Sequence, residues 1–434
     1  MPARLPARLP IRLAAHLPLP DDSTVSVLRE GYAFIGNEAD RRGRDVFTTR
    51  LLGVPVICMR GPAAARLLYT DERLTRKGAM PPRVLHTLLG TDGVQGLDGQ
   101  AHRHRKAMFL ELLGPGVAAD SLVAAVTRHW RERLPEWEQA RHIVLNDEMS
   151  RILTAAVCEW AGVPLTQEEV PGRAADLVSL IESPAAVGPK HWRGRLARLH
   201  LQQWTGELVE RVRQGGFEAP GTALEKIALF TGADGRPLPR HTASVELLNV
   251  LRPTVAIARF VVFVAMALHS HRRLAEVLRG FEPESREVAA FVEEVRRTTP
   301  FFPATAARVR TPFEWQDVPF PEGRLVVVDL FGTDRDPGTW PRPEEFLPAR
   351  FDDFDQRPNR LYELVPQGAG DHAETHRCPG EWATVGIMRQ AVQILGRELD
   401  YDVPAQDLRV SLRRAPALPR SGFVMSGIQQ AARV

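Results

Sequence analysis

Residues 366–382 read Pro-Gln-Gly-Ala-Gly-Asp-His-Ala-Glu-Thr-His-Arg-Cys-Pro-Gly-Glu-Trp, a glycine-containing loop with one cysteine, Cys378, near its end. Apolar residues follow at helical spacing: Val385, Met388, Val392 and Leu395. The sequence therefore predicts a helix that begins just after Cys378, with Pro379 in its first turn. Free N–H groups and the helix dipole at such a terminus stabilise a thiolate. A thiolate is a strong axial ligand for haem iron.

Two other interpretations of this cysteine remain open. A buried free cysteine near a helix start is common, and we expect this role for Cys58 and Cys158, which lie in an apolar strand and an apolar helix. His372, His376 and Cys378 also bring three zinc-type ligands together within a short stretch. No fourth ligand is nearby, however, and the surrounding Gly, Pro and Asp favour a loop over a helical face that would align the two histidines.

The composition excludes several classes of protein. The chain has 434 residues, of which 44% are hydrophobic and 25% charged, as in globular proteins with a large core, so a disordered or fibrous chain is excluded. The 56 basic and 53 acidic residues give a net charge of +3, too even to indicate a nucleic-acid partner. The three cysteines form no disulfide framework, which predicts a reducing, cytoplasmic location.

The sequence predicts no membrane anchor. Residues 1–24 repeat Pro-Ala-Arg-Leu-Pro without an apolar core of signal-peptide length, so we expect a poorly ordered leader. The most apolar stretch, 255–268, is interrupted by Arg259 and is shorter than the roughly 20 residues that span a bilayer. No linker divides the remainder. Residues 25–434 are therefore predicted to form a single domain, mainly α with a small β-rich lobe.

Apolar periodicity places the elements of this domain. Helices are expected near 25–40, 99–113, 118–139, 145–161, 172–181, 193–214 and 288–298. A strand pair is expected at 45–59, and short strands near 307–310, 325–330 and 408–424. The segment 242–269 is predicted to form one helix of about 28 residues, roughly 40 Å long at 1.5 Å per residue. Such a helix would cross the molecule.

Four motifs in a fixed order resemble the cytochrome P450 family. Glu294-Val-Arg-Arg297 is similar to the family's Glu-x-x-Arg helix, and Pro348-Ala-Arg350-Phe351 to the segment whose arginine joins that pair in a buried ion network. Arg335-Asp-Pro337 and Pro343-Glu-Glu-Phe346 follow in the expected order before the Cys378 loop. The resemblance implies the cytochrome P450 fold and haem b with Cys378 as the axial thiolate.

Two departures from the family pattern point to one subgroup. The loop carries Asp371 and Glu374 where most members have Phe and Gly, and the long helix carries Arg252-Pro253 in place of the acid–alcohol pair that delivers protons to iron-bound dioxygen. Both departures resemble the fatty-acid peroxygenases and decarboxylases. The similarity extends upstream to Arg76-Lys-Gly78, Val94-Gln-Gly-Leu-Asp-Gly99 and the 102–106 segment, and so covers most of the chain.

This resemblance implies a long-chain fatty acid and hydrogen peroxide as partners, with no obligatory redox partner. Arg252 lies on an apolar segment, where it is costly to bury without an anion, so it is expected to hold the substrate carboxylate. That carboxylate would then serve as the general acid–base for cleavage of the O–O bond. Pro253 removes a helical N–H and displaces the carbonyl of Asn249, so it kinks the helix and makes room. Hydroxylation at the α or β carbon is expected, and decarboxylation to a terminal alkene is the competing outcome.

Other interpretations of the arginines are a solvated position or pairing with a protein carboxylate, and this is our prediction for Arg259. Gln95 aligns with a distal position where the subgroup carries Gln or His. Because an amide cannot donate a proton as imidazolium can, Gln95 favours hydroxylation. Residues that resemble the acyl channel, but equally suit a core, are Met80, Leu88, Leu89 and Phe301. Candidate partners of the haem propionates are Arg76, His102 and Lys106.

The sequence leaves two alternatives to a peroxygenase open. The first is a P450 monooxygenase that takes electrons from a redox partner and NAD(P)H, but it needs a proton relay that residues 251–256 lack. The second is a non-catalytic haem-thiolate sensor, which the acyl-channel pattern disfavours. Turnover with peroxide alone would separate both from a peroxygenase.

Overall fold

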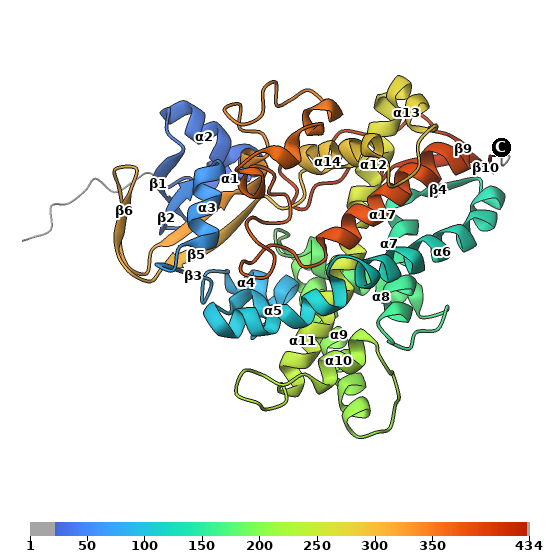
Figure 1. The fold of residues 1–434 in the computed structure, drawn as a ribbon, viewed down its shortest axis with the longest axis horizontal. Coiled ribbons are helices and arrows are strands. Elements are labelled where there is room, and N and C mark those ends of the chain that lie inside the picture. Colours follow the sequence, from blue (N-terminus) through green and yellow to red (C-terminus); the bar gives the residue numbers. More distant parts are fainter. Residues whose placement is uncertain (1–21, 432–434) are drawn as a thin grey trace, which may run out of the picture.

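The computed structural model describes residues 22–431, so residues 1–21 of the expected leader lie outside the described part of the chain. Residues 22–24, which were expected to belong to the leader, contact the fold: Asp22 bridges to Arg50 and accepts hydrogen bonds from the N–H groups of Thr24 and Gly53. A helical body and a smaller β-rich lobe lie side by side (Figure 1). The fold class predicted from the sequence is thus confirmed.

The β-rich lobe is built around a five-stranded sheet. Its strands are β1 (Val46–Leu51), β2 (Val54–Met59), β3 (Leu74–Thr75), β5 (Ala304–Val309) and β8 (Leu325–Asp329), in the order β1-β2-β8-β5-β3. β1 and β2 form the predicted antiparallel pair, and β2 runs parallel to β8. β6 (Phe313–Trp315) and β7 (Val318–Phe320) form a separate hairpin. The lobe also holds α1 (Thr24–Glu30), α2 (Phe34–Arg42) and α3 (Pro62–Thr70).

The helical body follows the predicted segments closely. Its first helices are α5 (Gly99–Leu113), α6 (Val117–Gln139), α7 (Leu145–Trp160), α8 (Val170–Glu182), α9 (Pro189–Arg213) and α10 (Ala223–Leu229). α8 and α9 begin earlier than predicted, because Pro171 and Pro189 stand in their first turns, where the missing N–H costs no helical hydrogen bond.

The long central helix departs from the prediction of one continuous rod. It is divided into α11 (Arg240–Ala256) and α12 (Ala258–Ser270), and the break at Ile257 comes one turn after Pro253. Proline disturbs the hydrogen bonding of the turn around it, and the Ile257 N–H bonds to the Thr254 carbonyl, 3.1 Å away and only three residues earlier. By length and composition residues 240–270 could cross a bilayer, but 78% of their most apolar window is buried inside the protein, as in a core helix.

The remaining helices are α13 (Arg272–Leu278), α14 (Arg286–Thr298), α15 (Leu330–Thr333), α16 (Arg360–Glu363) and α17 (Glu381–Gln393). A three-stranded sheet has the order β4 (His142–Val144), β10 (Val424–Gln430), β9 (Leu399–Asp402). The strand predicted at 408–424 is wrong. Apart from Val424, the first residue of β10, that segment holds only an isolated bridge between Val410 and Pro419, since Pro416 and Pro419 cannot donate to a ladder.

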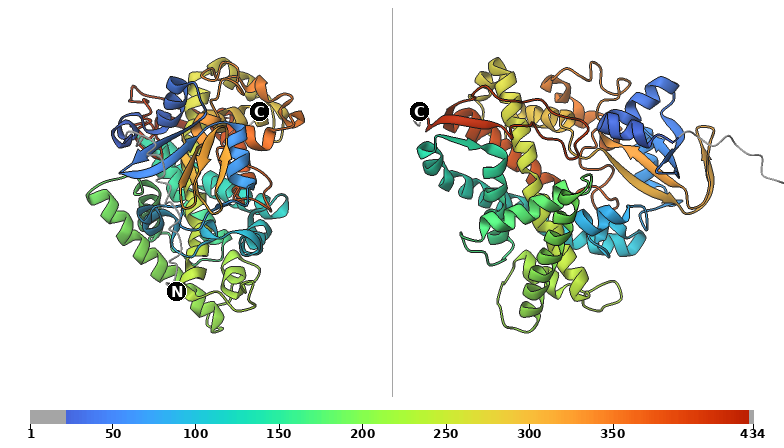
Figure 2. Two further views of the ribbon diagram at one scale, coloured as in Figure 1. Left: turned by 90° about the vertical axis from the view of Figure 1, so that its left-hand side faces the viewer. Right: turned by 180° about the vertical axis from the view of Figure 1, so that it is seen from behind.

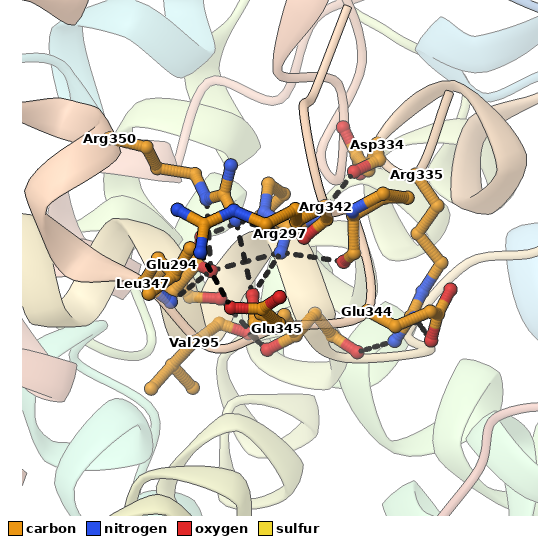
Figure 3. Close-up of polar contacts among 12 residues, drawn as sticks. Glu294, Val295, Arg297, Asp334, Arg335, Arg342, Glu344, Glu345, Leu347 and Arg350 are labelled. Carbon is orange, nitrogen blue, oxygen red and sulfur yellow. Dashed lines mark hydrogen bonds and ion pairs between the residues drawn. The ribbon is translucent and has the colours of Figure 1, made fainter. Parts of the chain in front are cut away.

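The ion network predicted from the motifs is present and buried (Figure 3). Glu294 of α14 accepts hydrogen bonds from Arg297 Nε at 2.7 Å and from Arg350 Nε at 3.1 Å. The Leu347 N–H also donates to Glu294, at 2.7 Å. This network ties α14 to the short helix η4 (Pro348–Phe351), which lies ahead of the Cys378 loop in the chain.

Candidate active site

Cys378 lies between the loop and α17. Its N–H donates to the Gln367 carbonyl at 2.9 Å, and α17 begins only at Glu381 after the N-cap Gly380. Pro379 was expected in the first helical turn but lies in the turn before the helix, because the Thr384 N–H bonds back to Gly380 and so sets the first turn. Burial raises the pKa of the Cys378 thiol, and a hydrogen bond from the Gly380 N–H opposes this rise.

The loop is held in shape by a close backbone approach and by one carboxylate. Gly368 has φ of 100°, and a Cβ there would stand 3.0 Å from Arg377 Cα, so only glycine fits without a shift. Glu381 accepts from His372 Nε2 at 2.9 Å, from Arg377 Nε at 2.6 Å and from Arg296. Burial alone would raise the pKa of Glu381, but the charge of Arg296 and the hydrogen bonds from His372 and Arg377 hold it well below its usual range.

The two loop histidines have separate environments, which bears on the zinc interpretation. His372 bonds to Glu381, whereas the His376 ring lies 3.9 Å from the ring of His102. Within residues 22–431 there is no group of three or more His, Cys, Asp or Glu side chains placed to hold a metal ion. The structure therefore gives no support to a zinc site formed by this loop.

Buried basic side chains gather beside Cys378. Arg76 donates to Thr305 Oγ1 at 2.8 Å and to the Ala306 carbonyl at 2.9 Å, and its Nη2 is buried without a hydrogen-bond partner. Lys106 Nζ donates to the carbonyls of Thr375, at 3.0 Å, and of Arg377. Burial lowers the pKa of Lys106 to about 8, and Cys378 opposes this shift.

His102 belongs to the same cluster. Burial, together with the charges of the nearby Lys106 and Arg76, lowers its pKa to about 4. Of these three residues Arg76 and Lys106 carry like charges, and buried like charges are unfavourable unless an anion compensates them. The cluster of Arg76, His102 and Lys106 therefore suits a group that brings anionic oxygens to this side of Cys378.

Arg252 is buried in α11, and its side chain is bonded to backbone. Its Nη1 donates to the Leu88 carbonyl, and it forms no ion pair with a carboxylate of residues 22–431. Burial lowers the pKa of Arg252 to about 9; the charge of Arg198 adds to this effect and Cys378 opposes it. Arg259, by contrast, is paired with Glu182 at 3.0 Å, as predicted.

Arg198 of α9 is a second buried guanidinium that sequence reasoning missed. Its Nη1 lies 3.3 Å from the Leu88 carbonyl and its Nη2 3.4 Å from the Leu89 carbonyl, while its Nε is buried without a partner. Burial lowers the pKa of Arg198 to about 10. Arg252 and Arg198 thus converge on the end of the short helix η2 (Leu85–Leu89). The available signal was an arginine between the apolar positions Ala197 and Leu201.

Gln95 lies in the 3₁₀ turn η3 (Val94–Gly96) and is oriented by a chain of polar side chains. Its Oε1 accepts from Asn249 Nδ2 at 3.3 Å, and the same Nδ2 donates to Glu246 at 2.8 Å. Glu246 is in turn paired with Arg105 at 2.6 Å. Because the Gln95 oxygen is engaged by Asn249, its NH2 group is left to donate elsewhere. Sequence reasoning assigned no role to Asn249, Glu246 or Arg105.

The four acyl-channel candidates have different surroundings. Leu88 is buried but belongs to none of the hydrophobic core clusters found among the described residues, and Met80 and Leu89 are half-buried outside those clusters. The Phe301 ring stacks on Phe260 of α12 at 4.4 Å and packs against the main core. Phe301 therefore contributes to the core. The carbonyls of Leu88 and Leu89 face the two guanidinium groups, which puts apolar side chains next to the cationic site.

Comparisons with known proteins agree with this architecture. The family model for cytochrome P450 matches residues 288–385. The chain is 42% identical to cytochrome P450SP alpha, covering 95% of this chain and 100% of that one with a TM-score of 0.90. It is 40% identical to cytochrome P450EX alpha solved with myristic acid, covering 95% and 99% of the two chains with a TM-score of 0.90.

A third solved structure, of cytochrome P450 OleT in complex with arachidonic acid, is 30% identical and covers 96% of this chain and 100% of that one with a TM-score of 0.90. These matches extend over nearly the full length of the chain and so include the Cys378 loop and the Glu294 network. As its motifs predicted, the chain belongs to the cytochrome P450 family.

Proposed function

We propose that the protein is a haem-thiolate peroxygenase that uses hydrogen peroxide to hydroxylate long-chain fatty acids at the α or β carbon. The observation that carries this proposal is the pair of buried guanidinium groups, Arg252 and Arg198, whose acceptors among residues 22–431 are backbone carbonyls. A buried cation is stable only with an anionic partner, and a substrate carboxylate is such a partner. The fatty acids in the structures of two relatives support the same substrate class.

The residues around Cys378 fit haem b. Cys378 would supply a thiolate to the haem iron, and the unpartnered Nη2 of Arg76, together with Lys106 and His102, would bind the propionates. When bound, a haem-thiolate group supplies the activation of peroxide, since the thiolate donates electron density that favours O–O cleavage. The three cysteines are free in the structure, and a reducing cytoplasm is part of the proposal.

The protein's own residues position the acid. Arg252 and Arg198 hold the carboxylate, whose oxygen accepts and returns the proton that an acidic side chain handles in other members of the family. Fixing this end of the chain limits reaction to the carbons nearest the head group. Pro253, where the helix is disturbed, makes room for the acid, and Met80, Leu88 and Leu89 would contact its acyl chain. Gln95 donates a hydrogen bond but no proton, which favours hydroxylation over decarboxylation.

One further observation disfavours a redox-partner-dependent monooxygenase. Residues 251–256 contain a single alcohol, Thr254, and its hydroxyl donates to the Val250 carbonyl at 2.9 Å. The hydroxyl is therefore engaged by its own helix. No acidic residue stands beside it in this stretch, so the pair that relays protons in such enzymes is not formed.

The test is to incubate the purified holoenzyme with a long saturated acid and hydrogen peroxide, without reductase, and to identify products by mass spectrometry. We expect 2- or 3-hydroxy acids. Arg252→Ala should abolish this turnover while the Soret band of bound haem persists, because only the head-group contact is removed. Thr254→Ala is the matched control on the same helix and should retain turnover.

The outcomes separate the rival functions. Full peroxide-driven activity in Arg252→Ala would refute the role of that arginine. Product only with NAD(P)H and a reductase would establish a monooxygenase instead. Absence of product under both conditions, with haem bound, would favour the sensor.

A further inference from the structure

The outer face of α9 is an exposed apolar stripe. Trp192, Leu196 and Leu199 are 62%, 56% and 63% exposed, and their spacing of four and three residues puts them on one side of the helix. Val187, in the loop just before α9, is 79% exposed. The long green helix at the lower edge of the molecule is α9 (Figure 2, left). Single exposed apolar residues are ordinary, but such a run on one helix indicates a contact surface.

The residues around this stripe are basic. Residues 183–206 contain no Asp or Glu. Lys190, Arg193 and His200 are exposed, and the Arg195 guanidinium lies over the Trp192 ring at 5.6 Å. An apolar helix face bordered by Lys and Arg, with a tryptophan among its apolar residues, is typical of helices that lie in the interface of an anionic bilayer.

The inner face of the same helix reaches the candidate active site. Arg198, one residue before Leu199, points inward and donates to the carbonyls of Leu88 and Leu89. One helix therefore separates the exposed stripe from the place where a fatty-acid head group would bind.

We infer that the surface formed by Val187, Trp192, Leu196 and Leu199, with its basic border, docks on the anionic lipid surface of a bilayer. The Trp and Leu side chains enter the acyl boundary while Lys190 and Arg193 contact the headgroups. The surface lies over the site where, under the function proposed above, the enzyme uses fatty acids, which partition into bilayers. Membrane binding itself does not depend on that activity.

Charge argues for lipid and against a second copy of the chain as the occupant. In a symmetric dimer the same patch meets itself, so Lys190, Arg193 and Arg195 would face their own counterparts. No acidic residue between 183 and 206 is available to compensate them. An anionic lipid surface neutralises all of these cations at once.

The experiment measures sedimentation of the holoenzyme with vesicles of phosphatidylglycerol or of phosphatidylcholine. We expect binding to phosphatidylglycerol at low salt, at least about tenfold weaker binding to phosphatidylcholine, and loss of binding at high salt, since screening removes the electrostatic contribution. The triple variant Trp192→Ser, Leu196→Ser, Leu199→Ser should lose most of the binding, as should Lys190→Glu with Arg193→Glu. Leu52→Ser and Val117→Ser, at exposed positions elsewhere (82% and 88%), are matched controls that should bind like wild type.

Each outcome decides the inference. Wild-type protein that stays in the supernatant with phosphatidylglycerol vesicles would overturn it, as would a triple variant that still binds them. Dimerisation of the wild type in light scattering that the triple variant abolishes would assign the surface to a second copy instead. Peroxide-driven turnover of a detergent-dispersed acid should be the same in the triple variant and the wild type, so a failure of the docking surface is distinguishable from a failure of the proposed activity.

Discussion

Arg252 and Arg259 lie on the same apolar stretch, yet their partners differ. Arg259 is neutralised by Glu182 of α8 at 3.0 Å, whereas Arg252 shares the Leu88 carbonyl with Arg198. A carbonyl is a neutral acceptor and compensates a buried positive charge only in part. Arg259 is therefore neutralised within the fold, whereas under the proposed function the charge of Arg252 is left for the substrate carboxylate.

Arg198 is expected to contribute to acid binding independently of Arg252. Arg198→Met should raise the Kd for a long saturated acid about tenfold, or about 1.4 kcal/mol, because one charged contact to the carboxylate is lost. The measurement is a titration of the haem Soret band with acid. Arg211→Met, on the exposed part of the same helix, is the control and should leave the Kd unchanged. An unaltered Kd in Arg198→Met would contradict the role of that residue.

Asp329 should make stability depend on pH. It caps α15 through the Gly332 N–H at 2.7 Å, and burial raises its pKa to about 7. In the unfolded chain the carboxyl ionises near pH 4. Between about pH 4 and 7 the folded chain therefore keeps a proton that the unfolded chain has lost, so the stability that this group contributes at low pH declines as the pH rises to 7.

Asp329→Asn keeps a cap oxygen and cannot ionise. The free energy of unfolding of the variant, relative to that of wild type, should therefore rise from pH 4 to pH 7 and then stay level. At pH 8 this difference should be larger than at pH 4 by at least about 1 kcal/mol. Urea denaturation at several pH values measures this difference. A difference independent of pH would show that the carboxyl does not titrate in this range.

Elements with regular apolar periodicity were predictable from the sequence. α5 and the β1–β2 pair match their expected bounds closely, because one buried face imposes the pattern. The break at Ile257 was not predicted. The sequence shows that Pro253 removes an N–H, but not which later turn changes its hydrogen bonding. The strand expected at 408–424 failed because its apolar residues lie between prolines that prevent pairing.

The candidate site was predictable only in part, for a related reason. Cys378 and Arg252 could be identified from the sequence, because Cys378 stands in a glycine-containing loop directly before a helix and Arg252 is a charged residue in an apolar helix. Arg198 makes its contacts with the backbone of Leu88, 110 residues away, and a carbonyl carries no sequence signal. The chain from Arg105 through Glu246 and Asn249 to Gln95 likewise joins elements that only the fold brings together.

Pro253 is expected to matter through the helix. Pro253→Ala restores an N–H that can bond to the Asn249 carbonyl, which should tighten this turn of α11 and shift the adjacent Arg252. Because small displacements of a positioning group are costly, peroxide-driven turnover should fall at least about tenfold while folding is retained. Pro135→Ala, at a proline in the interior of α6, is the control and should leave turnover unchanged. Equal activity of Pro253→Ala and wild type would remove Pro253 from the mechanism.

The site is assembled where the helical body meets the β-rich lobe. Arg76 is anchored to Thr305 and Ala306 of β5, while Lys106 of α5 reaches the Cys378 loop. The Glu294 network fixes the segment that leads to this loop (Figure 3). Under the proposed function, binding of haem would thus depend on contacts outside the Cys378 loop.

Breaking the Glu294 network should therefore destabilise the entire protein. Glu294→Ala leaves Arg297 and Arg350 buried without their carboxylate, a loss of about 3–5 kcal/mol for a buried pair. Denaturation, and the fraction of purified protein that holds haem, measure the effect. Arg342→Ala is the matched control, because the Arg342 side chain is 67% exposed in its pair with Glu345 and should change stability by less than about 1 kcal/mol. Similar losses in both variants would contradict a special role for the buried network.

The Leu88 carbonyl affects which ligands can bind to Arg252. Its oxygen already accepts from Nη1 of Arg252, so a guest that takes over this donor must offer a better acceptor than a peptide group. A carboxylate does so, since hydrogen bonds to an ionised oxygen are roughly twice as strong as neutral ones. Methyl esters, amides and alcohols exchange one neutral oxygen for another and gain little. Selection for ionised guests is in this way enforced by main-chain atoms, which no side-chain substitution at position 88 removes.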